Sequence, residues 1–223
     1  MRQEISPSIL NCDIGQLHAE LDKIATADNV HVDVMDNHFV PNLSWGLPVV
    51  ESVVKHGKLP VDVHLMIEDP DRWALDYAKA GVDSVTFHAE AATAPVVLAR
   101  QLRAQGVKAG LGLRPATPIE PYIDLLKEFD MILIMTVEPG FGGQEFIEAM
   151  CEKIRRTRKA ISRTYLDISL QVDGGISRNT IEMAAQAGAN VFVAGSAVYK
   201  ADNAANEIAT LRKLAKQHCH GLV

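Results

Sequence analysis

The chain has 223 residues, 48% of them hydrophobic, and a formal net charge of −6. This length and apolar content suffice for one large core, and the absence of a basic block argues against a nucleic-acid partner. No run approaches the roughly 18 consecutive apolar residues of a membrane span, and the polar start 1–4 lacks the apolar core of a secretory signal, so we expect a cytoplasmic protein with no membrane partner.

Short runs rich in Val, Ile and Leu alternate along the chain with longer amphipathic stretches. They predict eight strands, each followed by a helical pattern, at residues 5–10, 30–35, 61–66, 84–88, 108–113, 131–136, 169–172 and 190–194. Strands separated by helices pair in parallel through right-handed crossovers. Gly81, Gly106 and Gly188 each stand where a helical pattern ends, which is typical of a C′ cap.

The order of these units favours one α/β fold over another. An open doubly wound sheet carries a glycine-rich fingerprint after its first strand, whereas segment 8–13 contains no glycine. Glycine-rich turns follow only the sixth, seventh and eighth strands, which fits a barrel with a late phosphate site. With no linker or composition change, the sequence predicts a single (β/α)8 TIM barrel domain over residues 1–223.

Ionisable side chains stand on the predicted inward face of three strands. Side chains alternate inward and outward along a barrel strand, and catalytic ones come from the C-terminal strand ends. By this rule His31 and Asp33 share a face of the second strand, His64 lies on the third, and Asp173 follows the seventh. Two imidazoles with two carboxylates suit a divalent metal such as Zn, Fe or Mn, and burying them without one would be costly. We therefore predict a metal site formed by these four residues.

Three glycine-rich turns follow the last three strands. Glycine lets backbone N–H groups approach an anion closely, and a helix that begins just after the turn adds a favourable dipole. We predict phosphate contacts from these turns, which read Pro139-Gly140-Phe141-Gly142-Gly143-Gln144, Asp173-Gly174-Gly175 and Gly195-Ser196.

Met35, Met66 and Met135 fall at the ends of three predicted strands. Methionine commonly fills irregular gaps in a core, which is one interpretation of all three residues. The other is that their thioethers form a water-poor lid over a negatively charged intermediate. The second interpretation places these methionines among the substrate-contacting residues.

Together these motifs resemble the D-ribulose-5-phosphate 3-epimerase family. The similarity spans residues 5 to about 199 in the same order. It rests on the segments 7–10 (PSIL), 31–42 (HVDVMDNHFVPN), 62–66 (DVHLM), 139–144 (PGFGGQ), 172–175 (VDGG) and 193–197 (VAGSA). Two positions depart from the family's usual pattern: Asn11-Cys12 stands where Ser-Ala is usual, and Arg114 where Asn is common.

The resemblance implies a ribulose-phosphate-binding type of barrel and a role for each site residue. It implies that His31, Asp33, His64 and Asp173 bind one divalent cation (Fe2+, Mn2+, Co2+ or Zn2+), and that Asp33 and Asp173 form the acid–base pair. Ser8 and His64 would contact the sugar. The implied phosphate contacts are Gly140, Phe141, Gly142, Gly143, Gly174, Gly175, Gly195 and Ser196.

The implied reaction interconverts the pentulose phosphates D-ribulose 5-phosphate and D-xylulose 5-phosphate. The C3 proton is weakly acidic until the C2 carbonyl is polarised, and a metal there would stabilise a cis-enediolate. Inversion requires the new proton to arrive on the opposite face. We assign Asp33 as acceptor and Asp173 as donor in one direction, with the roles exchanged in reverse.

Three alternatives stay open from the sequence. An allulose-6-phosphate 3-epimerase would use the same parts with a longer pocket. A metal-free phosphate-binding barrel lyase would share the late glycines but would not need two His and two Asp. A non-catalytic sugar-phosphate binding module would need no acid–base pair. For the epimerase we also expect a homo-oligomer.

Overall fold

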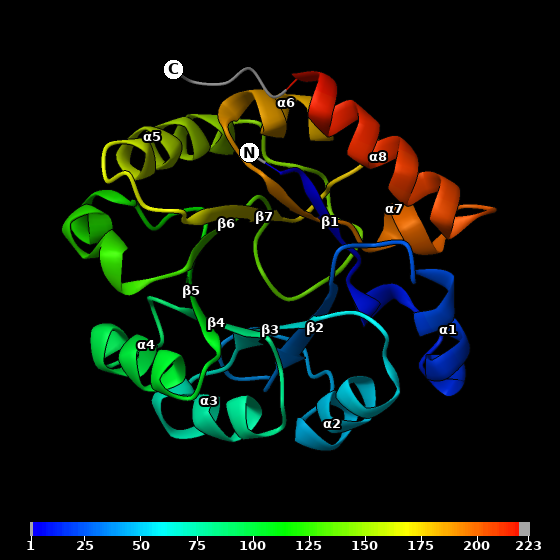
Figure 1. The fold of residues 1–223 in the computed structure, drawn as a ribbon, viewed down its shortest axis with the longest axis horizontal. Helices are drawn as coiled ribbons and strands as arrows, with labels where there is room; N and C mark the ends of the chain where they lie inside the picture. The colour runs from blue at the N-terminus through cyan, green and yellow to red at the C-terminus, as the bar shows by residue number, and fades with distance from the viewer. Residues whose placement is uncertain (1, 219–223) are drawn as a thin grey trace.

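Eight parallel strands curl into a barrel in the computed structural model, which describes residues 2–218 (Figure 1). Their order is β1-β8-β7-β6-β5-β4-β3-β2, so each strand pairs with its neighbour in the sequence or, for β1, with the last strand. Between β1 and β2 the ring is joined by the His31 N–H, which donates to the Pro7 carbonyl at 2.9 Å. The TIM barrel is confirmed, with strands β1 Glu4–Ser6, β2 Val30–Met35, β3 Val61–Met66, β4 Ser84–His88, β5 Lys108–Leu113, β6 Met131–Met135, β7 Ser169–Asp173 and β8 Val191–Val193.

Helices form the outer ring around these strands (Figure 1). They are α1 Leu17–Lys23, α2 Leu47–His56, α3 Pro70–Lys79, α4 Pro95–Ala104, α5 Met150–Ser162, α6 Ile181–Ala187, α7 Ser196–Tyr199 and α8 Ala204–His218, with a 3-10 helix at Glu120–Glu128. Gly81, Gly106 and Gly188 have φ of 91°, 80° and 112°, which confirms the predicted left-handed caps. Within residues 2–218, no helix combines the length and apolar character that crossing a membrane requires.

The predicted first strand, residues 5–10, is wrong in its second half. β1 ends at Ser6, because Pro7 has no N–H to donate and the Ser8 side chain accepts from the Leu10 N–H at 3.2 Å. The chain therefore turns into a 3-10 helix at Ile9–Asn11. The other strand boundaries differ from prediction by one residue or none.

Carboxylates close the N-terminal end of the barrel. Each accepts the backbone N–H of a residue near the start of another strand, at 2.9, 2.8 and 2.9 Å for the pairs Asp28 with Ile5, Asp83 with Val61, and Asp130 with Ala109. Asp28 also accepts from Arg212 at 2.9 Å and from Arg2 at 2.7 Å. This end of the barrel is thus fixed by charge-assisted hydrogen bonds.

Glycines in β5 make room for inward side chains of β4. Thr86 pairs with Gly110 and His88 with Gly112. A Cβ atom at Gly110 would lie 2.2 Å from the Thr86 hydroxyl, and one at Gly112 would lie 3.3 Å from the His88 ring. The spacing of these glycines therefore lets a buried imidazole sit at the C-terminal end of the barrel.

Candidate metal centre

The register of β2 on β3 sets the first three residues of the site. His31 pairs with Asp62 and Asp33 with His64, so alternation directs all four side chains to the barrel interior. Their exposed fractions are 3% or less. Asp173 ends β7 and remains 15% exposed at its side chain. Strands β2, β3 and β7 thus present the imidazoles of His31 and His64 and the carboxylates of Asp33 and Asp173 at the C-terminal mouth of the barrel.

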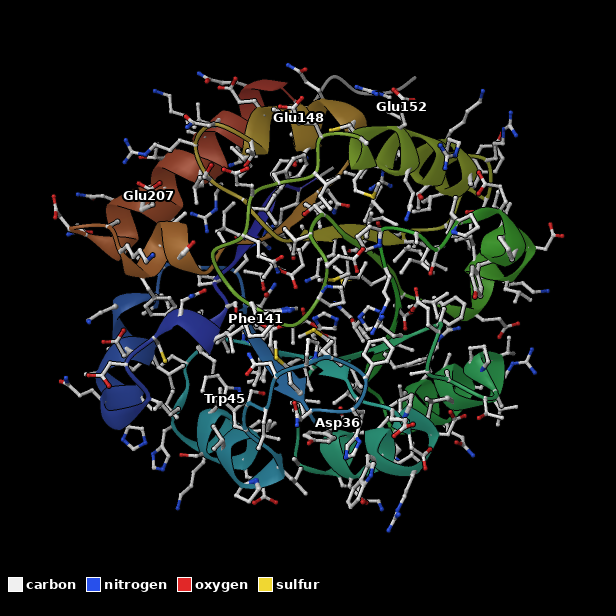
Figure 2. The ribbon with its side chains drawn as sticks, turned by 180° about the vertical axis from the view of Figure 1, so that it is seen from behind. Asp36, Trp45, Phe141, Glu148, Glu152 and Glu207 are labelled. Atoms are coloured by element: carbon white, nitrogen blue, oxygen red, sulfur yellow. The ribbon has the colours of Figure 1, made fainter. Side chains whose placement is uncertain are left out.

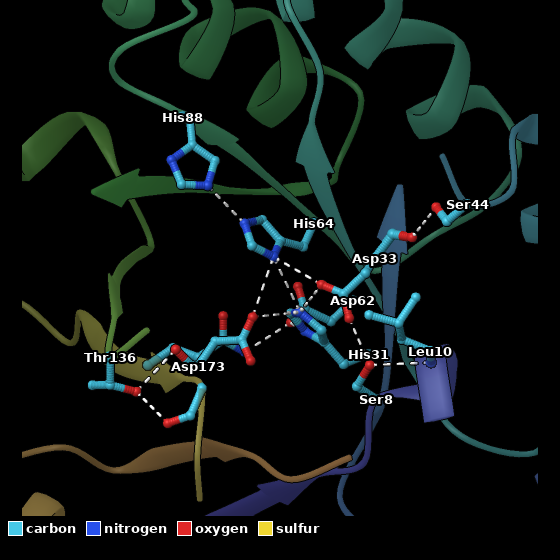
Figure 3. Close-up of polar contacts among 12 residues, drawn as sticks. Ser8, Leu10, His31, Asp33, Ser44, Asp62, His64, His88, Thr136 and Asp173 are labelled. Carbon is cyan, nitrogen blue, oxygen red and sulfur yellow. Dashed lines mark hydrogen bonds and ion pairs between the residues drawn. The ribbon is translucent and has the colours of Figure 1, made fainter. Parts of the chain in front are cut away.

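Four potential ligand atoms converge there, all within 4.8 Å of one another (Figure 3). Asp33 Oδ1 lies 3.0 Å from His64 Nδ1 and 3.3 Å from His31 Nε2. Asp173 Oδ2 lies 3.5 Å from the same His64 nitrogen and 3.9 Å from the same His31 nitrogen. A mixed set of imidazole nitrogens and carboxylate oxygens fits a divalent transition metal. The structure therefore brings the four sequence-predicted residues together as a metal site requires.

Asp62 orients His31 from the side away from this cluster. Its Oδ2 atom lies 2.8 Å from His31 Nδ1, and the Asp62 carboxylate also accepts from Ser84 Oγ at 2.6 Å and Gln171 Nε2 at 2.8 Å. Because a carboxylate is only an acceptor, His31 Nδ1 carries a proton, so Nε2 is the nitrogen that can bind a cation once any proton on it has left. Such an outer partner fixes the tautomer of a metal-binding histidine.

The cluster is strongly polarised. Burial opposes the ionisation of Asp33, but the adjacent His31 and His64 hold its pKa well below the usual value. Burial likewise opposes protonation of the imidazoles, but Asp33, Asp62 and Asp173 raise the pKa of His31 and His64 above 6.5. Ser8 adds a hydrogen bond of 2.5 Å from its Oγ to Asp33 Oδ2. The aspartate thus remains an anion beside two imidazoles, as cation binding requires.

Two further ionisable groups lie behind His64, and the sequence did not predict them. His88 Nε2 lies 2.9 Å from His64 Nε2, and His88 Nδ1 lies 3.1 Å from Glu90 Oε2. Burial lowers the pKa of His88 to about 4. Burial opposes the ionisation of Glu90, but its interactions with His88, Thr117 and the Arg114 backbone N–H together lower its pKa to about 2. Inward alternation applied to β4 would have marked His88, since it follows Thr86 by two residues.

A pocket opens above the cluster at the end of the barrel. The sequence-predicted residues that line it are Ser8, Asp33, Met35, Met66, Met135, Gly140, Phe141, Gly142, Gly143, Asp173, Gly174, Gly175, Gly195 and Ser196. His64 does not line it and lies fully buried against Asp33. The side chains of the three methionines are only 2–3% exposed, so they form a buried apolar wall of the pocket.

The turn after β6 forms one side of this pocket. In Figure 2 the segment that carries Phe141 passes across the open end of the barrel, and the Phe141 side chain is 54% exposed. Asn42 Nδ2 donates to the Gly140 carbonyl at 2.7 Å, which ties this turn to the loop after β2. Two loops that are distant in sequence thus meet over the cluster.

Close packing requires glycine at two positions of the next turn. Gly174 has φ of 119° and a Cβ there would lie 2.5 Å from the Val137 side chain. Gly175 has φ of 66° and its Cβ would lie 2.5 Å from the Phe146 nitrogen. These two glycines therefore have a structural reason to be present in addition to any contact with phosphate.

The two departures from the family pattern lie in different places. Asn11 lines the pocket, where a Cβ at Gly195 would lie 2.3 Å from its Oδ1. Arg114 does not line the pocket. Its guanidinium carbon lies 4.0 Å from the centroid of the Phe39 ring, and it donates to the Phe39 carbonyl.

Comparison with known proteins places this site in a family. The model of the Ribulose-phosphate 3 epimerase family matches residues 4–199. The chain belongs to the ribulose-phosphate 3-epimerase family. A ribulose-phosphate 3-epimerase of Mycobacterium bovis is 54% identical over 211 residues, which cover 95% of this chain and 92% of that protein. One of Escherichia coli is 46% identical over 199 residues, covering 87% of this chain and 88% of that protein.

Solved structures of other barrels share the fold at low identity. The 3-hexulose-6-phosphate synthase of Salmonella typhimurium matches with a TM-score of 0.68 at 19% identity, covering 96% of this chain and 99% of that one. The N-(5'-phosphoribosyl)anthranilate isomerase of Pyrococcus furiosus matches with a TM-score of 0.62 at 17% identity, covering 97% and 100%. At these identities the likeness describes the barrel, while the epimerase family assignment rests on the sequence relatives.

Proposed function

We propose that this chain is a metal-dependent epimerase that interconverts D-ribulose 5-phosphate and D-xylulose 5-phosphate. The observation that carries this proposal is the convergence of His31, Asp33, His64 and Asp173 within 4.8 Å, in a chain of the ribulose-phosphate 3-epimerase family. A phosphate-binding lyase has no use for this set of buried ionisable groups. A binding module has no use for two carboxylates at a reacting carbon.

Asp33 and Asp173 act in this proposal as the two proton-transfer groups. They come from β2 and β7, which are separated around the barrel, and both line the pocket. Asp33 takes the C3 proton on one face of the sugar and Asp173 delivers a proton on the other. The hydrogen bond from Ser8 and the contact with His64 hold the Asp33 carboxylate in place for this transfer.

A divalent cation held by the two histidines and two aspartates would polarise the C2 carbonyl and stabilise negative charge that develops there. We propose Fe2+, Mn2+, Co2+ or Zn2+, because this donor set is intermediate in softness. Met35, Met66 and Met135 keep water away from the reacting carbons, which strengthens each electrostatic contact in the pocket.

The phosphate of the substrate is proposed to bind at the late turns. Gly142, Gly143, Gly195 and Ser196 line the same pocket as the two aspartates. Helix α7 begins at Ser196, and its N-cap residue Gly195 makes no side-chain hydrogen bond to the N–H groups of the first turn. Backbone N–H groups explain how an acidic chain binds an anion.

A coupled assay on D-ribulose 5-phosphate tests this function. We expect turnover that is lost after exhaustive chelation and returns with Fe2+, Mn2+, Co2+ or Zn2+, and much weaker turnover of unphosphorylated D-ribulose. The same preparation assayed with allulose 6-phosphate decides between pentulose and hexulose phosphates. Full activity in a demonstrably metal-free sample would contradict the metal-dependent mechanism.

The setting of this activity is proposed from relatives and from the sequence. A rice relative that is 43% identical over 216 residues is named as a cytoplasmic isoform, which supports a cytoplasmic location here. The single domain over residues 1–223 and the homo-oligomer stay predictions. Size measurement in solution by light scattering tests the second.

A further inference from the structure

The 3-10 helix after β1, at Ile9–Asn11, runs along the wall of the pocket. Ser8 precedes this helix and donates a hydrogen bond of 2.5 Å to Asp33 (Figure 3), and Asn11 ends it. Both Ser8 and Asn11 line the pocket. The segment therefore contacts a proposed proton-transfer group at its start, while the proposed function gives no role to its last residue.

The Asn11 side chain lies between two of the turns that are proposed to bind phosphate. A Cβ atom at Gly142, in the turn after β6, would lie 2.8 Å from both Nδ2 and Oδ1 of Asn11. A Cβ atom at Gly195, in the turn after β8, would lie 2.3 Å from Oδ1. A side chain at either position would displace the amide. The two glycines thus leave the room in which Asn11 reaches both turns.

The Asn11 amide has this position without a hydrogen-bond partner. In the part of the chain that the structure describes, no group forms a hydrogen bond with its side chain, although the amide carries two donor hydrogens and is only half-buried. Asn42 differs, because its Nδ2 donates to the Gly140 carbonyl at 2.7 Å and its Oδ1 accepts the Leu43 N–H at 2.9 Å. An amide that only tied the turns together would bond to their backbone, as Asn42 does.

The ligand that suits the free amide is an anion with acceptor oxygens. Among residues 2–218, no lysine or arginine lines the pocket, and Asp33 and Asp173 make its inner end acidic. Apart from a bound cation, only neutral donors can hold a phosphate there. Gln144 is the other side-chain amide in the pocket wall, and it already donates to the Glu138 and Phe141 carbonyls at 2.7 and 2.8 Å.

We propose that Asn11 is a substrate-binding residue whose Nδ2 donates to the phosphate of the pentulose phosphate, beside the N–H groups of the late turns. One short segment then serves both ends of the substrate, since Ser8 holds Asp33 at the reacting carbon and Asn11 holds the phosphate. This inference rests on the proposed function, from which it takes the substrate and the location of its phosphate. Loss of the amide should weaken the binding of a phosphorylated sugar and leave the proton-transfer groups as they are.

Kinetics with a phosphorylated and an unphosphorylated sugar separate this role from a structural one. Asn11→Ala should raise KM for D-ribulose 5-phosphate by about 10–100-fold, the range for losing a hydrogen bond to a charged group, with little change in kcat. The inhibition constant of inorganic phosphate should rise with it. The kcat/KM for D-ribulose should keep its wild-type value, because that sugar has no phosphate. Asn206→Ala, at an exposed asparagine on α8, is the matched control and should change none of these values.

Asn11→Asp keeps the proposal testable if the alanine variant does not fold. Aspartate has the size of asparagine but replaces the donor with a charge that repels phosphate, so KM for D-ribulose 5-phosphate should rise more than in Asn11→Ala. A folded variant with the wild-type KM for the sugar phosphate would overturn the proposal, as would an equal loss of kcat/KM on both sugars. Wild-type protein that turns over neither sugar would instead contradict the proposed function.

Discussion

Two sets of aspartates, one at each end of the barrel, have opposite roles. At the N-terminal end, Asp28, Asp83 and Asp130 each accept a backbone N–H from another strand, and Asp28 also binds two arginines. At the C-terminal end, the Asp33 and Asp173 carboxylates accept no backbone N–H from residues 2–218 and instead face His31 and His64. Asp28, Asp83 and Asp130 satisfy the backbone, whereas Asp33 and Asp173 converge on a single point.

This difference separates stability from chemistry. A carboxylate whose oxygens are occupied by backbone and arginine donors has no capacity left for a ligand, and its loss affects folding. A carboxylate pressed against other ionisable groups is costly for the metal-free fold but can bind a cation or move a proton. Changes at the two ends should therefore have separable effects on metal binding and on unfolding.

The pH dependence of metal binding is expected to show the largest difference between the two ends of the barrel. His31 and His64 have a raised pKa, so they keep a proton at pH values where an ordinary histidine, with a pKa near 6.5, has lost it. That proton must leave before a cation binds, so affinity should fall as pH is lowered from 8 to 6, by about tenfold per unit for each displaced proton. Titration calorimetry in two buffers of different ionisation heat measures both the affinity and the proton release.

The ionisation of Asp28 at the N-terminal end should not change between pH 8 and 6. The pKa of Asp28 is lowered by its bonds to Ile5, Arg212 and Arg2 despite its burial. A lowered pKa gives stability that is present above the unfolded-state value and is lost only as pH falls through the folded-state value. Zn2+ affinity that stays constant between pH 8 and 6 would contradict the polarised cluster.

Removal of a carboxylate at the N-terminal end gives the smaller effect. Asp28→Ala leaves the Ile5 N–H and Arg212 without their 2.9 Å acceptor, which should lower the free energy of unfolding by about 1–3 kcal/mol. Epimerase activity and Zn2+ affinity should stay unchanged at temperatures where the variant is folded. Urea unfolding and the coupled assay on the same sample make the measurement. A variant of full stability with weakened metal binding would mean that the two ends are not separable in this way.

Much of this architecture was predictable from local patterns. Apolar runs predicted all eight strands, because the strands of a barrel are buried on both faces and contain few polar residues. Alternation along β2 and β3 was enough to place His31, Asp33 and His64 on one face. The end of β1 was missed because the pattern of Ile9 and Leu10 is apolar, while Pro7 and the Ser8 side chain decide the backbone.

The partners of the ligands were harder to predict. Contact between His64 and His88 depends on the register of two strands and on the space left by Gly112, neither of which a single strand's pattern contains. Glu90 lies beyond the end of β4, in a turn with no periodicity. Asn11 comes close to Gly142 and Gly195 only after the barrel closes, so its position in the pocket had no local signal.

The central claim, that two aspartates serve the two faces of C3, is tested most directly with Asp173→Asn. This change keeps the size and one oxygen of the side chain but removes its ability to take up and release a proton at working pH. We predict that epimerisation falls by at least the ~10²–10⁴-fold typical of losing a general acid–base group. In D2O the variant should still exchange the C3 hydrogen of one epimer through Asp33, and metal content measured in the same sample separates chemistry from ligand loss. A metal-replete Asp173→Asn protein with near-normal epimerisation would contradict the two-aspartate mechanism.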